Sequence, residues 1–414
     1  MTTQPTGATS AVFAGVVGLA CVGAGLAAAV FLATLDVVTG VFIEHPTLVW
    51  TLPVMGLLVG LVTHRWGGRT NDGMRLVIAE WREPGPVGIP AYLAPAVLAA
   101  TLATHLAGGS AGREGTSVQM AAAIGDTMGR RFGFDVDDRR RLLTVAVAAG
   151  FSAVFGVPWA GAVFALEVGP GGPRRWLADT PGWTARSGQV AVVIAGSWLA
   201  HFTVLAVGVS HQHRVAVSSG RASDLGWVAL AGVAFGLAAF VSVRLLETVR
   251  GALSRVVAWP PARPMLGGVV VLLLALGSGD RSTLGLSLPL LDDALAGVSI
   301  IGWLFALKIV MTAVTVGSGF RGGEVTPMFV IGATLGGSLA WWWGAPATLL
   351  AAVGMVATFG AAANAPATAF VIGLELFGVG AAIPLGLGCV VARLCSGSRH
   401  LYGEAATEPA AEQV

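Results

Sequence analysis

The segment GGSAGREGTSVQMAAAIG (residues 108–125) holds the most informative pattern in this chain. Arg113 and Glu114 stand side by side among glycines, directly before an apolar run that is typical of a helix. Glycines let a backbone turn sharply and approach a ligand closely, and the free N–H groups at a helix start attract anions. The segment therefore predicts an anion site at a helix start, where a carboxylate would compete with a mobile anion.

The composition around this segment is typical of a membrane protein. Hydrophobic residues make up 55% of the 414 residues and charged residues 11%, whereas soluble domains carry about 25% charged residues. The mean hydropathy is +0.78. The long apolar runs are residues 11–34, 48–62, 91–106, 190–207, 225–243 and 298–316. Since runs of about 18 residues can span a bilayer, we predict a polytopic protein with roughly ten or more helical segments, not all of which span.

The distribution of arginines predicts the orientation of the chain in the membrane. Arginines gather in short connections at residues 65–82, 130–141, 174–186 and 244–255. Short basic connections face the cytoplasm, so residues 210–224 would face the other side. The first ten residues lack the basic start and the cleavage site of a secretory signal, and this favours a retained first helix.

An internal repeat relates the two halves of the chain. GSAGREG (residues 109–115) aligns with GSGFRGG (residues 317–323) at an offset of 208 residues (317 − 109). At the same offset FSAVFGVPWAGAVFALEV (residues 151–168) aligns with FGAAANAPATAFVIGLEL (residues 359–376). Duplicated halves with interrupted helices are typical of channels and secondary transporters. We predict an N-terminal tail (1–10), a first transmembrane repeat (11–208), a connecting loop (209–224), a second repeat (225–402) and a C-terminal tail without a regulatory domain (403–414).

The second half contains a similar carboxylate. GGEVTPMF (residues 322–329) places Glu324 after glycines and before Thr326 and Pro327, and proline suits the first turn of a helix. Thr326 either caps this helix or donates its hydroxyl to an anion, and the two roles are compatible. Glu324 is either a second carboxylate of the ion pathway or a loop carboxylate paired with an arginine. Both alternatives remain open at this stage.

Two interpretations of Glu114 compete. It either gates the anion site and carries a proton, or only satisfies the positive end of the helix with Arg113 as its partner. Ionisable side chains inside a membrane region are usually functional. We therefore predict that Glu114 performs the chemistry and that Arg113, which recurs as Arg321, belongs to the scaffold.

The remaining polar residues carry less information. Lys308, the only lysine, lies in an apolar run and either binds backbone carbonyls or extends toward the interface. His211 and His213 favour a solvated loop over a metal site. The cysteines have no metal-ligand spacing and are expected to be small core residues; they are Cys21, Cys389 and Cys395.

Taken together, these motifs resemble the CLC family of anion channels and proton-coupled anion antiporters. GREG before an apolar helix, GGEVTP, and NAPATAFVIGLE (residues 364–375) follow the order of that family across nearly the whole chain. The resemblance implies an all-α polytopic membrane fold of two related, inverted halves with broken helices. It also implies a homodimer in the inner (plasma) membrane of a bacterium, with one pathway per subunit. Glu114 would be the gating glutamate, and Tyr402 in RHLYGE would donate its hydroxyl to the central anion.

Several departures from the chloride pattern resemble the fluoride/proton antiporter branch. Chloride-selective members carry GSGIP where this chain has Gly73 and Met74, the latter 40 residues before Glu114 (114 − 74) and without a serine nearby. A similar segment, GPVGIP (residues 85–90), lies too close to Glu114 and also lacks the serine. Furthermore, GREGT replaces GREGP, and an apolar residue of chloride members is replaced by Glu324.

A further departure concerns the proton path. The best-known chloride exchangers have an inner proton glutamate one position after Glu167, where this chain has Val168. Glu167 and its repeat counterpart Glu375 are expected to pack helices near the dimer surface, outside the ion path. The resemblance therefore implies Glu114 and Glu324 as the active carboxylates. The implied anion-binding residues are Gly73, Met74, Gly115, Val325, Thr326 and Tyr402.

We predict a secondary active transporter that exchanges fluoride for protons and exports fluoride from the cytoplasm. Fluoride is small and strongly hydrated, so its site needs strong donors such as Thr326, Tyr402, helix-terminal N–H groups or a protonated carboxyl. The alternative is a chloride/proton antiporter or a passive chloride channel of the same fold, and a membrane receptor or scaffold that binds anions is a third reading. No spacing of catalytic or metal-ligating residues predicts an enzyme, a metal or a cofactor. The expected partners are fluoride or chloride, protons and the lipid bilayer, without nucleic acid.

Overall fold

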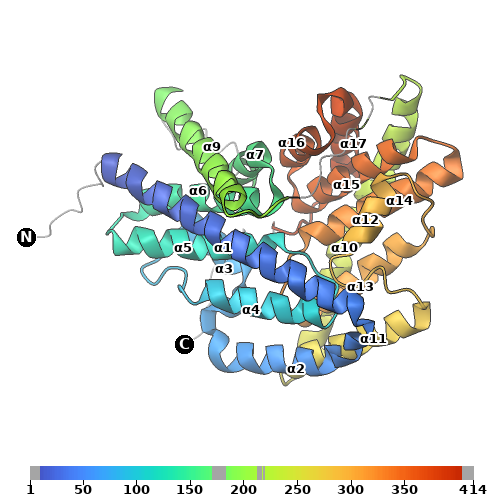
Figure 1. Cartoon of the computed structure of the whole chain (residues 1–414), viewed down its shortest axis with the longest axis horizontal. Coiled ribbons are helices and arrows are strands. Elements are labelled where there is room, and N and C mark those ends of the chain that lie inside the picture. Colours follow the sequence, from blue (N-terminus) through green and yellow to red (C-terminus); the bar gives the residue numbers. More distant parts are fainter. Residues whose placement is uncertain (1–9, 170–182, 212–216, 218–219, 403–414) are drawn as a thin grey trace, which may run out of the picture. The chain divides into compact units, whose positions relative to one another are not determined.

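The computed structural model describes residues 10–169, 183–211, 217 and 220–402 (Figure 1). Within these ranges the regular secondary structure is helical, which confirms the predicted all-α class. The chain forms two compact units. The first unit comprises Met1–Asp36, Gly67–Ala99 and Glu114–Gln212, and the second comprises Val37–Trp66, Ala100–Arg113 and His213–Val414.

The helices have the following bounds. The first unit contains η3 (Gly68–Asp72), α3 (Met74–Arg82), α5 (Glu114–Arg131), α6 (Val136–Phe155), α7 (Pro158–Val168) and α9 (Trp183–Ala206). Two α-helices contribute residues to both units, namely α1 (Ser10–Glu44) and α4 (Leu93–Leu106). The second unit contains η1 (Pro46–Thr51), α2 (Leu52–Val62), α10 (Asp224–Val256), α11 (Ala262–Ser278), α12 (Leu288–Leu295), α13 (Leu304–Ser318), α14 (Val325–Trp343), α15 (Ala347–Ala363), α16 (Pro366–Phe377), η4 (Val379–Ala381) and α17 (Ala382–Cys395). The short helix η2 (Thr63–Gly67) also crosses the boundary, because its residues up to Trp66 belong to the second unit and Gly67 belongs to the first.

The helix lengths agree with a membrane protein whose helices do not all span. By length and composition, 5 helical segments of the described chain are apolar enough to cross a membrane. They are Ser10–Glu44, Pro46–Arg82, Ser187–Ala206, Asp224–Val256 and Val325–Trp343. Shorter apolar helices, including α7, α15 and α16, fall below the length of a full span.

The central helix of the first unit is α6, which contacts α5, α7 and α9. Asp135 caps its start by accepting a 2.8 Å hydrogen bond from the Asp138 backbone N–H. Small residues let α5 approach closely, because a Cβ added to Gly150 would lie 2.6 Å from the Ala121 Cβ. Close packing through small residues is the usual way in which membrane helices associate.

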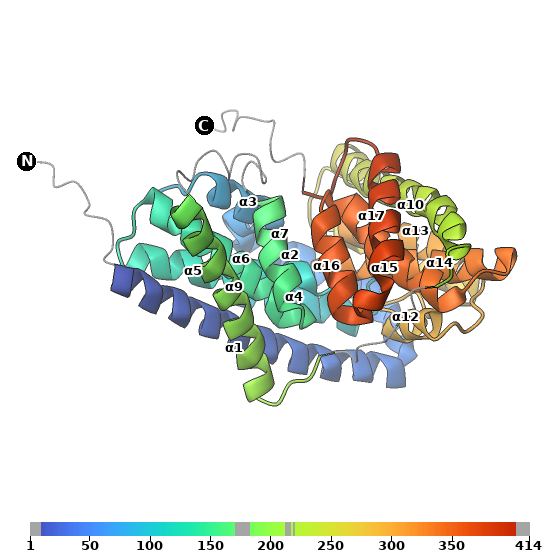
Figure 2. The same ribbon diagram turned by 90° about the horizontal axis from the view of Figure 1, so that it is seen from above.

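In the second unit, α14 and α15 form a closely packed pair, and α15 also contacts α10 and α17 (Figure 2). Gly332 and Gly336 of α14 face the backbone of α15 at Gly354 and Leu350, where an added Cβ would collide with a carbonyl oxygen. Any larger side chain at these two glycines would push the helices apart. This close packing therefore fixes the position of α14 against α15 within the second unit.

The helix boundaries recur at the offset of the internal repeat. The C-cap residue after α6 is Gly156 with φ +74°, and the C-cap residue after α15 is Asn364 with φ +56°; both are left-handed and lie 208 residues apart (364 − 156). Two residues later, Pro158 begins α7 and Pro366 begins α16. These matches agree with a duplication, whereas the limits of the halves at 11–208 and 225–402 stay a prediction.

Candidate anion site

The two glycine segments singled out in the sequence pair with each other through their backbones. Gly112 N–H donates to the Gly323 carbonyl at 2.6 Å, and Gly323 N–H donates to the Gly112 carbonyl at 2.7 Å. Both residues belong to the second unit. Gly322 has to be small here, because an added Cβ would lie 2.5 Å from the Ala111 Cβ. Gly112 precedes Glu114 by two residues and Gly323 directly precedes Glu324, so this bridge fixes the chain just before each carboxylate.

Hydroxyl groups on α13 hold the segment that leads to Gly112. Ser110 Oγ lies 2.9 Å from Thr312 Oγ1, and the Ser110 backbone N–H donates to Thr315 Oγ1 at 3.2 Å. On the other side, His105 Nε2 of α4 lies 3.2 Å from the Ala111 carbonyl oxygen. These buried contacts keep the segment in one conformation, as a preorganised binding site requires.

Glu114 is the first residue of α5 and is 1% exposed. The first N–H groups of a helix have no partner within it and carry its partial positive charge. Ser117 fixes this helix start, since its Oγ donates to the Gly150 carbonyl of α6 at 2.8 Å. Gln119 Nε2 donates to the Gly115 carbonyl at 3.0 Å. Glu114 is therefore a buried carboxylate at the positive end of a rigid helix.

Gly73 and Met74 begin another helix of the first unit, α3. Met74 is its first residue, and Gly73 has φ +54° and ψ −121°, a conformation that side chains other than glycine rarely adopt. α3 contacts α5 within the first unit. Gly73 and Met74 therefore stand at the start of one of two packed helices, and Glu114 and Gly115 stand at the start of the other.

The second unit contains the other predicted residues at the start of α14. Glu324 directly precedes this helix, Val325 is its first residue and Thr326 its second. Of the two alternatives for Thr326, the structure does not place it at the cap, because the helix begins at Val325 and the cap position falls on Glu324, two residues before Thr326. Val325 and Thr326 are buried, so their backbone and hydroxyl groups belong to the interior of the unit.

Tyr402 lies in the last described segment, beyond α17. The Leu401 N–H donates to the Ala362 carbonyl of α15 at 2.9 Å and ties this segment to the helix that packs on α14. Burial, together with the charge of Arg393, lowers the pKa of His400.

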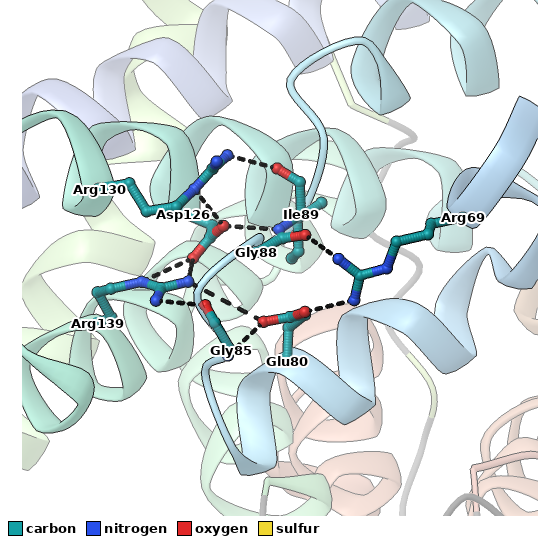
Figure 3. Close-up of polar contacts among 8 residues, drawn as sticks. All are labelled: Arg69, Glu80, Gly85, Gly88, Ile89, Asp126, Arg130 and Arg139. Carbon is teal, nitrogen blue, oxygen red and sulfur yellow. Dashed lines mark hydrogen bonds and ion pairs between the residues drawn. The ribbon is translucent and has the colours of Figure 1, made fainter. Parts of the chain in front are cut away.

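A buried ion network holds α3, α5 and α6 together (Figure 3). Its centre is Asp126 of α5, whose side chain is 0% exposed. Asp126 Oδ1 accepts from Arg139 Nη2 at 2.6 Å and from Arg139 Nε at 3.1 Å. Asp126 Oδ2 accepts from Arg130 Nε at 3.0 Å and from the Ile89 backbone N–H at 2.7 Å. Arg130 Nη2 in turn donates to the Ile89 carbonyl at 2.8 Å.

Glu80 connects α3 to this network. It accepts a 2.6 Å bond from Arg69 Nη2 and a 2.8 Å bond from the Gly85 backbone N–H, and it lies 4.0 Å from Arg139 Nη2. Arg69 Nη1 donates to the Gly88 carbonyl at 2.9 Å and Arg139 Nη1 to the Gly85 carbonyl at 2.7 Å. The segment GPVGIP, which imitates an anion motif in the sequence, is thus a clamped connection.

This network is absent from the sequence predictions, although it positions the helix that begins at Met74. The feature of the sequence that could have revealed this network is the presence of two acidic residues, Glu80 and Asp126, within helices that are buried on most sides. The arginines were visible only as cytoplasm-facing charge.

Lys308 of α13 is fully buried in the second unit. Its Nζ donates to the Thr283 carbonyl at 3.1 Å, the Gly285 carbonyl at 2.9 Å and Ser287 Oγ at 2.8 Å. An ammonium has three donors, and each has a neutral acceptor here. The Gly285 N–H donates to the Gly108 carbonyl at 3.2 Å. The reading in which Lys308 binds backbone carbonyls is thereby confirmed, and its contacts reach the segment that leads to Gly112.

Lys308→Met is expected to lower the free energy of unfolding by about 1–3 kcal/mol, since the buried oxygens would lose their donor. Methionine keeps the unbranched shape, so the change isolates the ammonium. Urea unfolding in mixed micelles measures this loss. The control is Arg281→Met, which lies in the connection that supplies the acceptors of Lys308. The Arg281 side chain is exposed, so the expected change in the free energy of unfolding is within about 0.5 kcal/mol. Equal losses for both variants would contradict a clamping role for Lys308.

The two histidines of the predicted loop, His211 and His213, lie partly outside the described residues, since His213 is among those left out. His211 is half-buried, with Nε2 2.8 Å from the Ala153 carbonyl and its ring centroid 5.1 Å from that of His201. The expectation of a solvated loop is therefore wrong for His211, because α6 supplies an acceptor. Within the described chain, no group of 3 or more His, Cys, Asp or Glu residues could hold a metal ion.

Comparison with known proteins identifies the family. A profile of voltage gated chloride channels matches residues 55–397. A "Chloride/fluoride channel protein" of Pseudomonas syringae pv. tomato is 37% identical over 393 residues, which cover 93% of this chain and 84% of the relative.

Solved structures agree with this match. The crystal structure of a CLC-type fluoride/proton antiporter superimposes with a TM-score of 0.87 at 28% identity, covering 95% of this chain and 98% of that one. A slow cyanobacterial Cl−/H+ antiporter gives a TM-score of 0.78 at 19% identity, covering 94% and 96%, and supports the fold alone. The chain therefore belongs to the voltage gated chloride channel (CLC) family of membrane proteins, whose members are anion/proton antiporters or anion channels.

Proposed function

We propose that this protein exchanges fluoride for protons and thereby exports fluoride from the cytoplasm. The observation that carries the proposal is the buried carboxylate of Glu114 at the first residue of α5. An anion attracted to this helix start must displace that carboxylate, or a proton must neutralise it. One side chain thus responds to both ions, as coupled exchange requires.

The preference for fluoride is supported by the residues at the start of α14 and by two relatives. Fluoride needs donors strong enough to replace its water, and charge-assisted hydrogen bonds are the strongest kind. Thr326, Tyr402 and the N–H groups of Gly115 and Val325 are proposed as these donors. Fluoride appears in the names of the Pseudomonas syringae relative and of the antiporter that is 28% identical.

The remaining residues receive the following roles in this proposal. Glu114 is the gate and proton carrier, Glu324 is a second carboxylate that donates when protonated, and Gly73 and Met74 begin the helix that lines the anion approach. The protein would be a homodimer in a bacterial inner membrane, with one pathway per subunit and related halves at 11–208 and 225–402. The inward proton gradient would drive export, with about 2.3 kcal/mol per charge for each 100 mV.

Fluxes from liposomes that contain the purified protein test this function. Fluoride efflux, followed with a fluoride electrode, is expected to exceed chloride efflux more than tenfold, a difference of about 1.4 kcal/mol in the barrier. The luminal pH should change in step with fluoride. Equal fluoride and chloride fluxes would contradict the fluoride assignment. Anion flux without proton movement would identify a passive channel, and the absence of both fluxes would favour an anion receptor.

A further inference from the structure

One face of α10 exposes a continuous apolar stripe. Its exposed residues are Leu230, Val233, Leu237, Phe240 and Val241. Successive residues from Leu230 to Phe240 are three or four positions apart, and Val241 follows Phe240 directly. This spacing places all of them on one side of a helix. α10 is long and apolar enough to span the membrane. The stripe is therefore suited to contact with lipid acyl chains.

The same face continues into a basic groove toward the end of α10. The groove has a volume of about 360 Å³ and is lined by Arg244, Glu247, Thr248, Gly251, Ala252, Arg255 and Arg399. The α10 members continue the helical spacing of the stripe. Two small residues, Gly251 and Ala252, stand between the arginines of this helix. Because a helix rises 1.5 Å per residue, Arg244 and Arg255 are separated by about 16 Å along its axis.

The charges of the groove favour an anionic ligand. Three arginines face one carboxylate, Glu247, which is paired with Arg399 at 3.0 Å. Arg244 and Arg255 are exposed, and guanidinium groups bind phosphate oxygens in a bidentate manner. The Arg244 guanidinium also lies 5.9 Å from the centre of the Phe240 ring, so the apolar stripe and the basic groove adjoin.

The end of α10 and the residues that follow it locate the groove at the membrane surface. Val256 and Trp259 are exposed directly after Arg255. Exposed tryptophans are enriched at the level of the lipid headgroups, and arginine-rich ends face the cytoplasm. The groove therefore lies where the phosphates of the cytoplasmic leaflet are found.

We propose that this groove binds the phosphate headgroup of an anionic phospholipid, whose acyl chains lie along the apolar stripe of α10. Basic pockets at the cytoplasmic ends of membrane helices recognise such headgroups. A free phosphate shares the headgroup chemistry but makes no use of the stripe. The adjoining stripe and groove therefore select the lipid over the soluble anion.

Native mass spectrometry of the detergent-solubilised protein tests the proposal. The probes are phosphatidylglycerol and phosphatidylcholine with identical acyl chains. The wild type is expected to bind phosphatidylglycerol at least tenfold more tightly. The double variant Arg244→Gln/Arg255→Gln should weaken this binding by about 30-fold, down to the level of phosphatidylcholine. The matched control is Arg131→Gln/Arg141→Gln, which removes two exposed arginines from α5 and α6 and should leave binding unchanged.

Two further measurements separate lipid from free phosphate. Phe240→Ala shortens the stripe but keeps the arginines, and it should weaken phosphatidylglycerol binding by about threefold to tenfold. Inorganic phosphate at the concentration of the lipid should leave the lipid bound. The proposal is overturned if the wild type binds both lipids equally or if the control variant loses binding as strongly as the groove variant. The proposal is also overturned if equimolar phosphate displaces the lipid and Phe240→Ala leaves phosphatidylglycerol binding unchanged. That result would assign the groove to a soluble anion.

Discussion

Glu114→Gln is expected to lower proton flux by about 100-fold or more while fluoride still crosses the membrane. Glutamine has nearly the same shape as glutamate but cannot take up and release a proton, and a side chain that transfers protons contributes about 10²–10⁴ to such a step. Glu114 is 1% exposed at the first residue of α5, so water would not easily take over its role.

The measurement is the simultaneous recording of fluoride and pH in liposomes with a fixed fluoride gradient. Glu167→Gln is the matched control, since this glutamate lies on α7 and is predicted to stand outside the ion path. The control should keep the ratio of protons to fluoride of the wild type. An unchanged ratio in Glu114→Gln would remove this residue from the proton path, and a lost ratio in Glu167→Gln would place that glutamate within it.

The sequence was most informative where function depends on local chain geometry. Glycine followed by a carboxylate and an apolar run predicts a helix start, and α5 and α14 do begin at Glu114 and directly after Glu324. The repeat offset likewise locates the proline starts of α7 and α16. These features depend on residues close together in the chain, so the pattern alone suffices. The cap of α14 lies at Glu324, two residues before the candidate Thr326, and this difference is within the usual uncertainty of about one to two residues at helix ends.

The contacts that position the site could not be predicted in this way. Gly112 pairs with Gly323, more than two hundred residues later in the chain, and Asp126 meets Ile89 across 37 residues. Such pairs form only when distant helices pack, and a single sequence contains no period or motif that reports them. Lys308 illustrates the same limit, since its three acceptors follow from the path of the connection before α12.

Asp126→Asn is expected to lower the free energy of unfolding by about 3–5 kcal/mol, because the buried Arg139 would lose the partner of its charge. Glu80 lies 4.0 Å from Arg139 Nη2 and compensates only in part. The start of α3 would be less firmly held, so we also expect slower anion flux from the protein that remains folded. Urea unfolding in mixed micelles measures the first effect, and liposome flux measures the second.

The control for this change is Asp137→Asn, the same substitution near the start of α6. The Asp137 side chain is 74% exposed and pairs with Arg140 at 3.0 Å, and an exposed pair of this kind contributes about 0.2–1 kcal/mol. The double variant Asp126→Asn/Arg139→Gln provides the sharper test. If the buried charge is the cause, removing both partners should cost less than the sum of the two single changes by at least about 1 kcal/mol. Two outcomes would contradict this role of the network: additive losses in the double variant, or a loss in Asp126→Asn no greater than that in Asp137→Asn. Either would mean that apolar packing holds α3, α5 and α6 together and that the ion network contributes little to stability.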